Sequence, residues 1–97
     1  MMKHSKQPHR GDFIKVNTSD ETYYEGDIGV VNDRLILYPN TAYLLVEWIT
    51  FKHGTCLRLG WIAADKVECI FRPTNKKERL VFYSACLNGR FADNNKY

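Results

Sequence analysis

The side chains that could carry out chemistry are few and lie far apart along the chain. His53 and Cys56 are three residues apart, which would suit a pair of metal ligands or a thiol beside an imidazole base. A zinc site needs two further ligands, and the remaining candidates form no second pair: His4, His9, Cys69 and Cys86. On a hairpin, positions i and i+3 also project to opposite faces unless the turn intervenes. We therefore predict no metal site, no cofactor and no enzymatic activity.

Two glycines stand three residues apart in the segment Glu25–Asp33, EGDIGVVND. Loops that hold phosphate place glycines so that backbone N–H groups face the anion, and they usually precede a helix. Here Asp27 lies between the glycines, Glu25 and Asp33 flank them, and a strand-like sequence follows. Because these carboxylates would repel an anion, we interpret the glycines as structural. They allow a positive φ or a bulge where a strand begins.

Acidic and aromatic residues gather in the same part of the chain. Paired carboxylates can hold Ca²⁺ or act in acid–base catalysis, but the D-x-D-x-D-G pattern of a calcium loop is missing. A cluster of like charges also steers association with a basic partner, and nearby tyrosines would supply buried contact area. The predicted protein-binding residues are Asp20, Glu21, Tyr23, Tyr24, Glu25, Asp27 and Tyr38.

The composition fits one small globular domain. The chain has 97 residues, of which 44% are hydrophobic and 13% aromatic, enough for a single core. Three cysteines without a close pair, and no signal peptide, favour free thiols in a reducing compartment, so we expect a cytoplasmic protein. The longest apolar run, Ala42–Val46, is far shorter than the roughly 20 residues that cross a bilayer, so no membrane contact is expected.

The net charge of +3 is unevenly distributed. Residues 1–10 carry three bases and no acid, residues 11–71 carry five bases and nine acids, and residues 72–97 carry six bases and two acids. The middle is therefore acidic and both ends are basic, unlike a uniformly cationic nucleic-acid binder. The bases of the tail form an alternative, nucleic-acid-binding set: Lys76, Lys77, Arg79 and Arg90.

Short strands separated by turns are predicted after a basic, aperiodic arm over residues 1–10. The predicted strands cover 13–16, 27–32 with an extension over 34–38, 42–51, 56–59 and 67–71. Residues 52–55 are predicted to form a hairpin turn, and 60–66 a crossover. Asn75 followed by Glu78 resembles a helix-capping box, and Gly89 marks a helix end. We therefore predict a helix over 76–87, although the apolar run 80–83 could also form a strand.

The strand predicted over 42–51 is apolar on both faces, so one face needs a cover from elsewhere in the chain. The residues that need this cover are Leu45, Ile49 and Phe51. We expect the C-terminal helix to supply it through a loose apolar stripe: Leu80, Val81, Tyr83 and Leu87. Trp48 and Trp61 are expected in the core.

Two stretches resemble known small barrels. The sequence GDFIKV over 11–16, followed by Gly26, Gly29 and Val31, resembles the KOW motif of transcription and ribosome-associated proteins. The sequence GWIAADKV over 60–67 resembles the G-x-x-P-x-N-Y-V segment of SH3 domains. In SH3 domains the proline and tyrosine of this segment line a groove for proline-rich peptides. Ala63 and Lys66 stand at those positions, so the resemblance implies the fold and not that ligand.

The resemblance implies a mainly β protein with a five-stranded SH3-like (KOW-like) barrel over 11–73. The residues of the tail predict in addition a basic helix or extension over 74–97 packed on the barrel. The first functional hypothesis is a non-enzymatic protein-interaction module that docks through the acidic, tyrosine-bearing loop. A small adaptor or a phage-type inhibitor of a host factor would have this character. The alternative is a nucleic-acid or ribonucleoprotein binder that holds phosphate with its basic arm and tail. Either a monomer or a homodimer fits.

Overall fold

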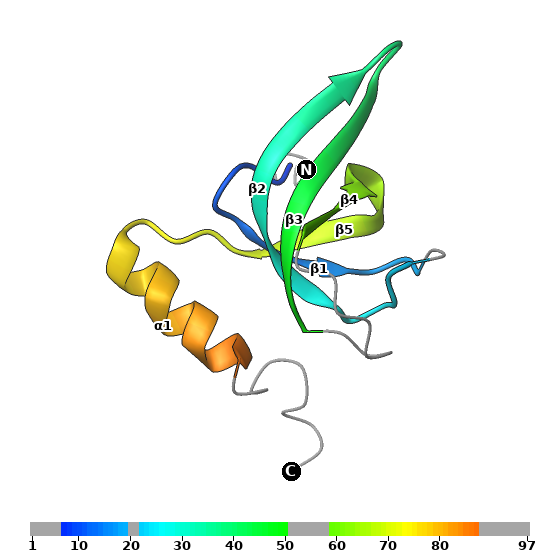
Figure 1. The fold of residues 1–97 in the computed structure, drawn as a ribbon. Helices are drawn as coiled ribbons and strands as arrows, with labels where there is room; N and C mark the ends of the chain where they lie inside the picture. The colour runs from blue at the N-terminus through cyan, green and yellow to red at the C-terminus, as the bar shows by residue number, and fades with distance from the viewer. Residues whose placement is uncertain (1–6, 20–21, 51–58, 88–97) are drawn as a thin grey trace, which may run out of the picture.

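The computed structural model describes residues 7–19, 22–50 and 59–87, which form one antiparallel sheet and a C-terminal helix (Figure 1). The strands are β1 (Phe13–Val16), β2 (Ile28–Leu37), β3 (Thr41–Thr50), β4 (Leu59–Ala63) and β5 (Val67–Phe71). The short 3-10 helix η2 (Ala64–Lys66) joins β4 to β5, and α1 (Lys76–Leu87) follows. The strand order is β4-β3-β2-β1-β5. The prediction of a mainly β fold with a C-terminal helix is thus confirmed.

The bounds predicted for the first strand, the last strand and the helix are those of β1, β5 and α1. The second predicted strand and its extension form the single strand β2. The predicted crossover over 60–66 is wrong, because residues 60–63 belong to β4 and only 64–66 form a turn. Gly60 and Ile62 pair with the buried Val46 and Leu44, and this alternation keeps the chain in the sheet. The turn predicted over 52–55 lies outside the described residues.

The strands β2 and β3 form a long hairpin whose far half extends beyond the body of the molecule (Figure 1). The first four residues of β2 are buried and its last six are exposed. Two register shifts interrupt the ladder, one between Ile28 and Gly29 and the other between Val31 and Asp33. Such irregularities increase the twist of a strand, and both lie in the first half of β2.

The main core lies on one face of the sheet and includes two stacked aromatic rings. The ring of Tyr23 stacks on that of Trp48, with centroids 4.2 Å apart and an interplanar angle of 23°. The other buried members are Ile14, Val16, Val31, Leu44, Val46, Ile62 and Val67. The core position expected for Trp48 is confirmed. Tyr23, expected on a docking loop, is only 3% exposed.

A second apolar cluster joins α1 to the sheet. Phe82 stacks on Phe71 with centroids 4.5 Å apart and meets Phe13 edge-on at 4.7 Å. Cys86 is buried in the same cluster, and Ile49 of β3 packs against this cluster. The helix therefore covers the Ile49 end of β3, as predicted, but the predicted stripe is wrong in part. The residues Leu80, Val81 and Leu87 are exposed, and the inward face of α1 carries Phe82, Tyr83 and Cys86.

The helix begins at a side-chain cap, as the sequence predicted. The Asn75 side-chain oxygen accepts a hydrogen bond from the Glu78 backbone N–H at 2.8 Å. The Glu78 carboxylate reaches one residue further back than in a capping box and accepts hydrogen bonds from the backbone N–H and hydroxyl of Thr74. These two bonds lower the pKa of Glu78. The bonds from Glu78 to Asn75 and from Thr74 to Glu78 together hold the first turn of α1 in place.

The glycines of the segment EGDIGVVND are structural, as predicted. Gly26 has a φ of +100°, and the pairing register of β2 shifts beside Gly29, at the strand entry. A Cβ on Gly29 would lie 2.8 Å from the backbone oxygen of Glu47. Asp27, between the glycines, is fully buried and accepts a hydrogen bond from the Tyr24 backbone N–H at 3.0 Å. Its carboxylate closes the turn into β2.

Gly60 leaves the space that the Tyr23 ring occupies, and this contact can be tested. A Cβ at position 60 would overlap the Tyr23 hydroxyl oxygen. We expect Gly60→Ala to lower the free energy of unfolding by about 1–3 kcal/mol, as overpacking does. In a Tyr23→Phe background the same change should cost at least ~1 kcal/mol less, because the overlapping atom is gone. Urea unfolding of the four proteins measures the cycle. If the two changes lower the free energy of unfolding additively, the contact between position 60 and the Tyr23 hydroxyl is contradicted.

Burial raises the pKa of the Cys86 thiol to about 11, above the ordinary 9.0. In this range the unfolded chain loses the thiol proton first, so the contribution of Cys86 to stability is present below pH 9 and is lost as the pH rises to 11. We expect the free energy of unfolding to fall over this range by about 2–3 kcal/mol more in the wild type than in Cys86→Ala. Denaturant titrations across the pH series measure the difference. Parallel curves would show that the buried thiol is not the cause.

Candidate functional site

The predicted protein-binding residues do not form one surface. Asp20 and Glu21 lie outside the described residues. Tyr23 and Asp27 are buried in structural roles, which corrects their expected place on the loop surface. The exposed members are Tyr24, Glu25 and Tyr38. Tyr24 precedes β2 and Tyr38 follows it, so an extended strand of about 30 Å separates them.

A different surface emerges from the register of β2, β3 and β4. Residues that pair across antiparallel strands point to the same face of a sheet. Leu35 pairs with Tyr43, and Leu45 pairs with Trp61. Leu37 and Leu59 lie on this same face, two residues along their strands from Leu35 and Trp61. We call this surface the outer apolar face: Leu35, Leu37, Tyr43, Leu45, Leu59 and Trp61.

The outer apolar face is open to solvent. Its exposed members, Leu35, Leu37, Leu59 and Trp61, are between 44% and 49% exposed. The core position expected for Trp61 is therefore wrong. Its neighbours Gly60 and Ile62 point to the core, so the alternation of the strand turns Trp61 outward. Apolar patches of several side chains on a small protein mark sites of association.

The helix α1 borders this face and does not cover it. The Tyr83 hydroxyl donates a hydrogen bond to the Glu47 carboxylate at 3.4 Å, and Glu47 pairs with Leu59 across β3 and β4. Leu80 and Leu87 are three and four residues from Tyr83, so they flank it on the same side of α1 and are exposed. Of the residues expected to be covered, Leu45 is half-buried and Phe51 lies outside the described residues.

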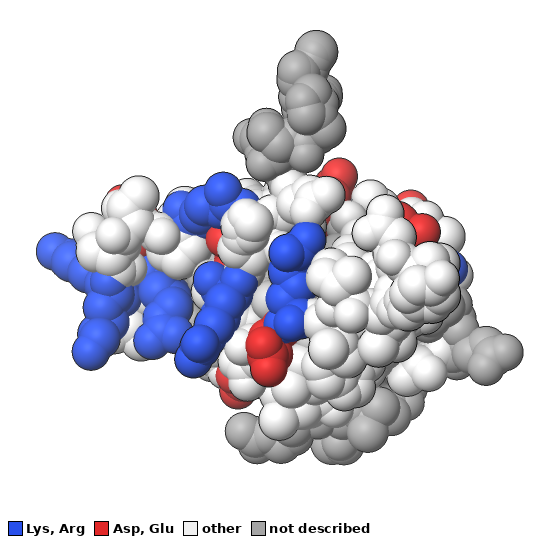
Figure 2. Space-filling model, turned by 90° about the horizontal axis from the view of Figure 1, so that it is seen from above, with Lys and Arg blue, Asp and Glu red and all other residues white. Residues whose placement is uncertain are grey.

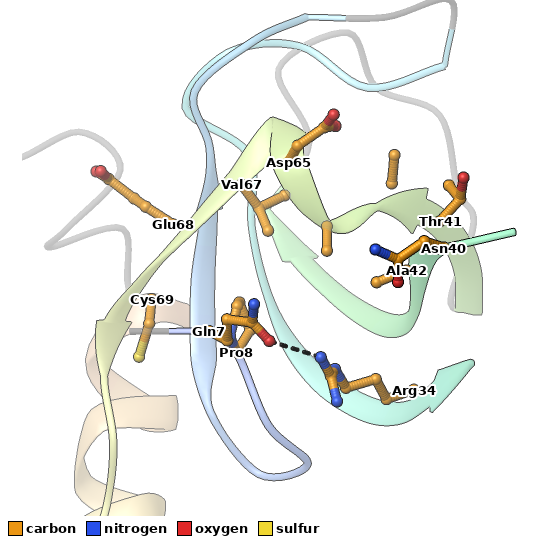
Figure 3. A pocket seen from close by; sticks show the side chains of 12 residues that line it. Gln7, Pro8, Arg34, Asn40, Thr41, Ala42, Asp65, Val67, Glu68 and Cys69 are labelled. Carbon is orange, nitrogen blue, oxygen red and sulfur yellow. Dashed lines mark hydrogen bonds between the residues drawn. The ribbon is translucent and has the colours of Figure 1, made fainter. Parts of the chain in front are cut away.

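A hollow of about 610 Å³ lies between the hairpin and the N-terminal residues (Figure 3). Gln7 accepts a hydrogen bond from the Arg34 guanidinium at 2.7 Å, and the Asp65 and Glu68 carboxylates point away from this pair. Burial and the nearby Asp12 carboxylate raise the pKa of the Cys69 thiol. The thiol stays protonated near neutral pH and is a weak nucleophile. The hollow is lined by both polar and apolar side chains, and its thiol is not activated as a nucleophile.

The predicted nucleic-acid-binding residues are partly brought together. Lys76, Lys77 and Arg79 lie exposed on the first half of α1, and Arg90 lies outside the described residues. Arg10, from the predicted basic arm, lies near them and lines the same hollow as Lys76 and Arg79. The sequence does not reveal this proximity, because a sheet of five strands separates Arg10 from α1 along the chain.

The segment that carries Arg10 is tied to the end of β5 by an ion pair between the buried Asp12 and the exposed Arg72. The Arg72 guanidinium donates hydrogen bonds from Nε and Nη2 to the two carboxylate oxygens of Asp12, at 2.9 and 2.7 Å. The buried Asp12 also accepts a hydrogen bond from the His9 backbone N–H at 2.7 Å. The hydrogen bond to Asp12 raises the pKa of Arg72, which stays charged.

Comparison with protein-family models, curated proteins and solved structures gives no match for the chain. Within residues 7–19, 22–50 and 59–87, no helix has both the length and the apolar character needed to span a membrane. The same residues contain no group of three His, Cys, Asp or Glu side chains placed to hold a metal ion. The pair His53 and Cys56 lies outside the described residues.

The Asp12–Arg72 pair should be a main source of stability. Arg72→Met would leave a buried carboxylate without its cation, and we expect the thermal midpoint to fall by on the order of 10 °C. Arg72→Lys should produce a smaller fall, because an ammonium group cannot make both contacts in the same fork geometry. Thermal unfolding followed by circular dichroism measures both. A midpoint unchanged in Arg72→Met would contradict the structural role of the pair.

Proposed function

We propose that this protein is a non-enzymatic interaction module, a small SH3-like barrel that docks on a protein partner through the outer apolar face. The barrel is supported by the all-antiparallel strand order, in which β1 pairs with both β2 and β5 and so brings the first and last strands together. The register shifts in β2 also support this proposal, because bulges increase the twist that a sheet needs to close.

The observation that supports the docking proposal is that part of the apolar face of β3, within the outer apolar face, is not covered by α1. The sequence already requires a cover for this face, and α1 covers only its Ile49 end. Trp61 and Tyr43 are residue types that dominate binding energy when a partner excludes water from them. Burying such a surface supplies the free energy of association.

The partner is expected to be apolar with a basic margin. The charged residues of this face are acidic: Asp33 pairs with Leu45, and Glu47 pairs with Leu59. Both acids lie beside the apolar side chains and not among the residues of the main core. A partner surface with apolar side chains at its centre and Lys or Arg at its edge would match this arrangement.

A pull-down from an extract of the source cells tests the proposal. The double variant Leu45→Ser with Trp61→Ser should lose the captured partner, with an affinity at least about 30-fold weaker, as expected for a hot spot. Tyr24→Ala with Glu25→Lys changes the originally predicted loop and should leave capture unchanged. Each variant is first checked for a wild-type thermal midpoint.

The outcomes separate the alternatives. If the Leu45 and Trp61 variant still captures the partner, the outer apolar face is not the docking site. If capture is lost only in the Tyr24 and Glu25 variant, the acidic loop is the docking site. Light scattering after size exclusion gives the mass of the free protein. A dimer abolished by the face variant would identify a second copy as the occupant and overturn docking on a different protein.

A further inference from the structure

The end of the molecule that carries α1 has a concentrated positive charge. Figure 2 shows Lys and Arg side chains gathered in a row over the side on which α1 lies in Figure 1. We call this surface the basic ridge: Arg10, Lys76, Lys77 and Arg79. All four residues are exposed, and none of their side chains forms an ion pair with a described residue. From this surface we infer a second activity, the binding of double-stranded nucleic acid through its phosphate backbone.

The two backbone segments that carry the ridge are held next to each other by the fold. The Asp12–Arg72 pair ties the turn that carries Arg10 to the segment that leads into α1. Arg72 also donates a hydrogen bond to the backbone oxygen of Gln7 at 3.1 Å. On the helix side, the Asn75 cap fixes the first turn. Arg10, Lys76 and Arg79 consequently surround one hollow of about 540 Å³.

The acids near the ridge compensate only part of its charge. Asp12 lines the same hollow, but it is buried and its carboxylate is already paired with Arg72. Glu78 is held by Thr74, and its lowered pKa keeps it anionic. Arg72 and the four ridge residues are therefore five cations set against two carboxylates. This local excess contrasts with the acidic balance of residues 11–71.

The lining of the hollow indicates the class of ligand. An acidic protein would need large apolar side chains at the centre of its interface, and no Leu, Ile, Val or Met side chain lines this hollow. Single-stranded nucleic acid is bound largely by stacking of bases on aromatic rings, and no Phe, Tyr or Trp lines the hollow. Cations that extend from a convex helix suit the phosphates of a duplex, and such contacts read no sequence.

The test is fluorescence anisotropy with a labelled DNA duplex, an RNA duplex and a single strand of the same length, across a salt series. We expect duplex binding whose logarithm falls linearly with the logarithm of salt concentration, with a slope of about −0.9 for each phosphate contacted, hence about −3 to −4 for four cations. Lys76→Glu with Arg79→Glu should weaken binding at least about tenfold and reduce the slope by about 2.

A matched control makes the same change in charge elsewhere. Lys15, which lies 3.9 Å from Glu68, and Lys66 of η2 are outside the ridge, and Lys15→Glu with Lys66→Glu should keep most of the affinity. An equal loss of duplex affinity in this control would show that only the net charge matters, and it would overturn the assignment of the binding site to the ridge. Tighter binding of the single strand, or no duplex binding at low salt, would overturn the inference. Anionic lipid vesicles bound in preference to the duplex would do the same.

The two proposals can be separated in one set of proteins. The variant Leu45→Ser with Trp61→Ser should bind the duplex as the wild type does, because neither residue lies on the ridge. The variant Lys76→Glu with Arg79→Glu should still capture the protein partner. If the docking proposal fails, the duplex measurement is unaffected, because it uses the protein alone.

Discussion

The arrangement of the fold depends on one buried carboxylate, that of Asp12. Asp12 stands just before β1 and receives both hydrogen bonds of Arg72, which stands just after β5. The pair therefore joins the beginning and the end of the sheet, where β1 and β5 lie side by side. It also sets the path of the chain into α1, and α1 in turn buries Phe82 and Cys86 against Phe13. Both proposed surfaces depend on where α1 lies.

The helix divides the surface of the molecule into two regions of different chemistry. Its inward face completes the second apolar cluster, and the bond from Tyr83 to Glu47 marks where its cover of β3 stops. Beyond that bond, the half-buried Leu45 and the exposed Trp61 lie beside acidic neighbours. Toward its N-terminus, Lys76 and Arg79 meet Arg10 across the end of the sheet. Apolar contact and phosphate contact would thus take place on separate parts of one small domain.

The candidate site was the least predictable part of the protein. The acids and tyrosines near residue 24 form a compact cluster in sequence, and in space this cluster separates. Tyr23 enters the core because Gly60 leaves room for its ring, and Asp27 enters the turn because its carboxylate accepts the Tyr24 backbone N–H. Trp61, which was expected in the core, is exposed instead, because it pairs with Leu45 and so lies on the outer face of the sheet. Residue type alone does not distinguish these environments.

The sequence by itself determined the local elements: β1, β5 and α1 have their predicted bounds, because alternation, capping and the lack of glycine or proline act over a few neighbouring residues. It also indicated that β3 needs a cover on its second face. Only the tertiary structure decided which side chains are exposed and which cations share a surface. Asp12 and Arg72 are 60 residues apart in sequence. Their pairing, like the register of the sheet, follows from long-range packing that no local pattern encodes.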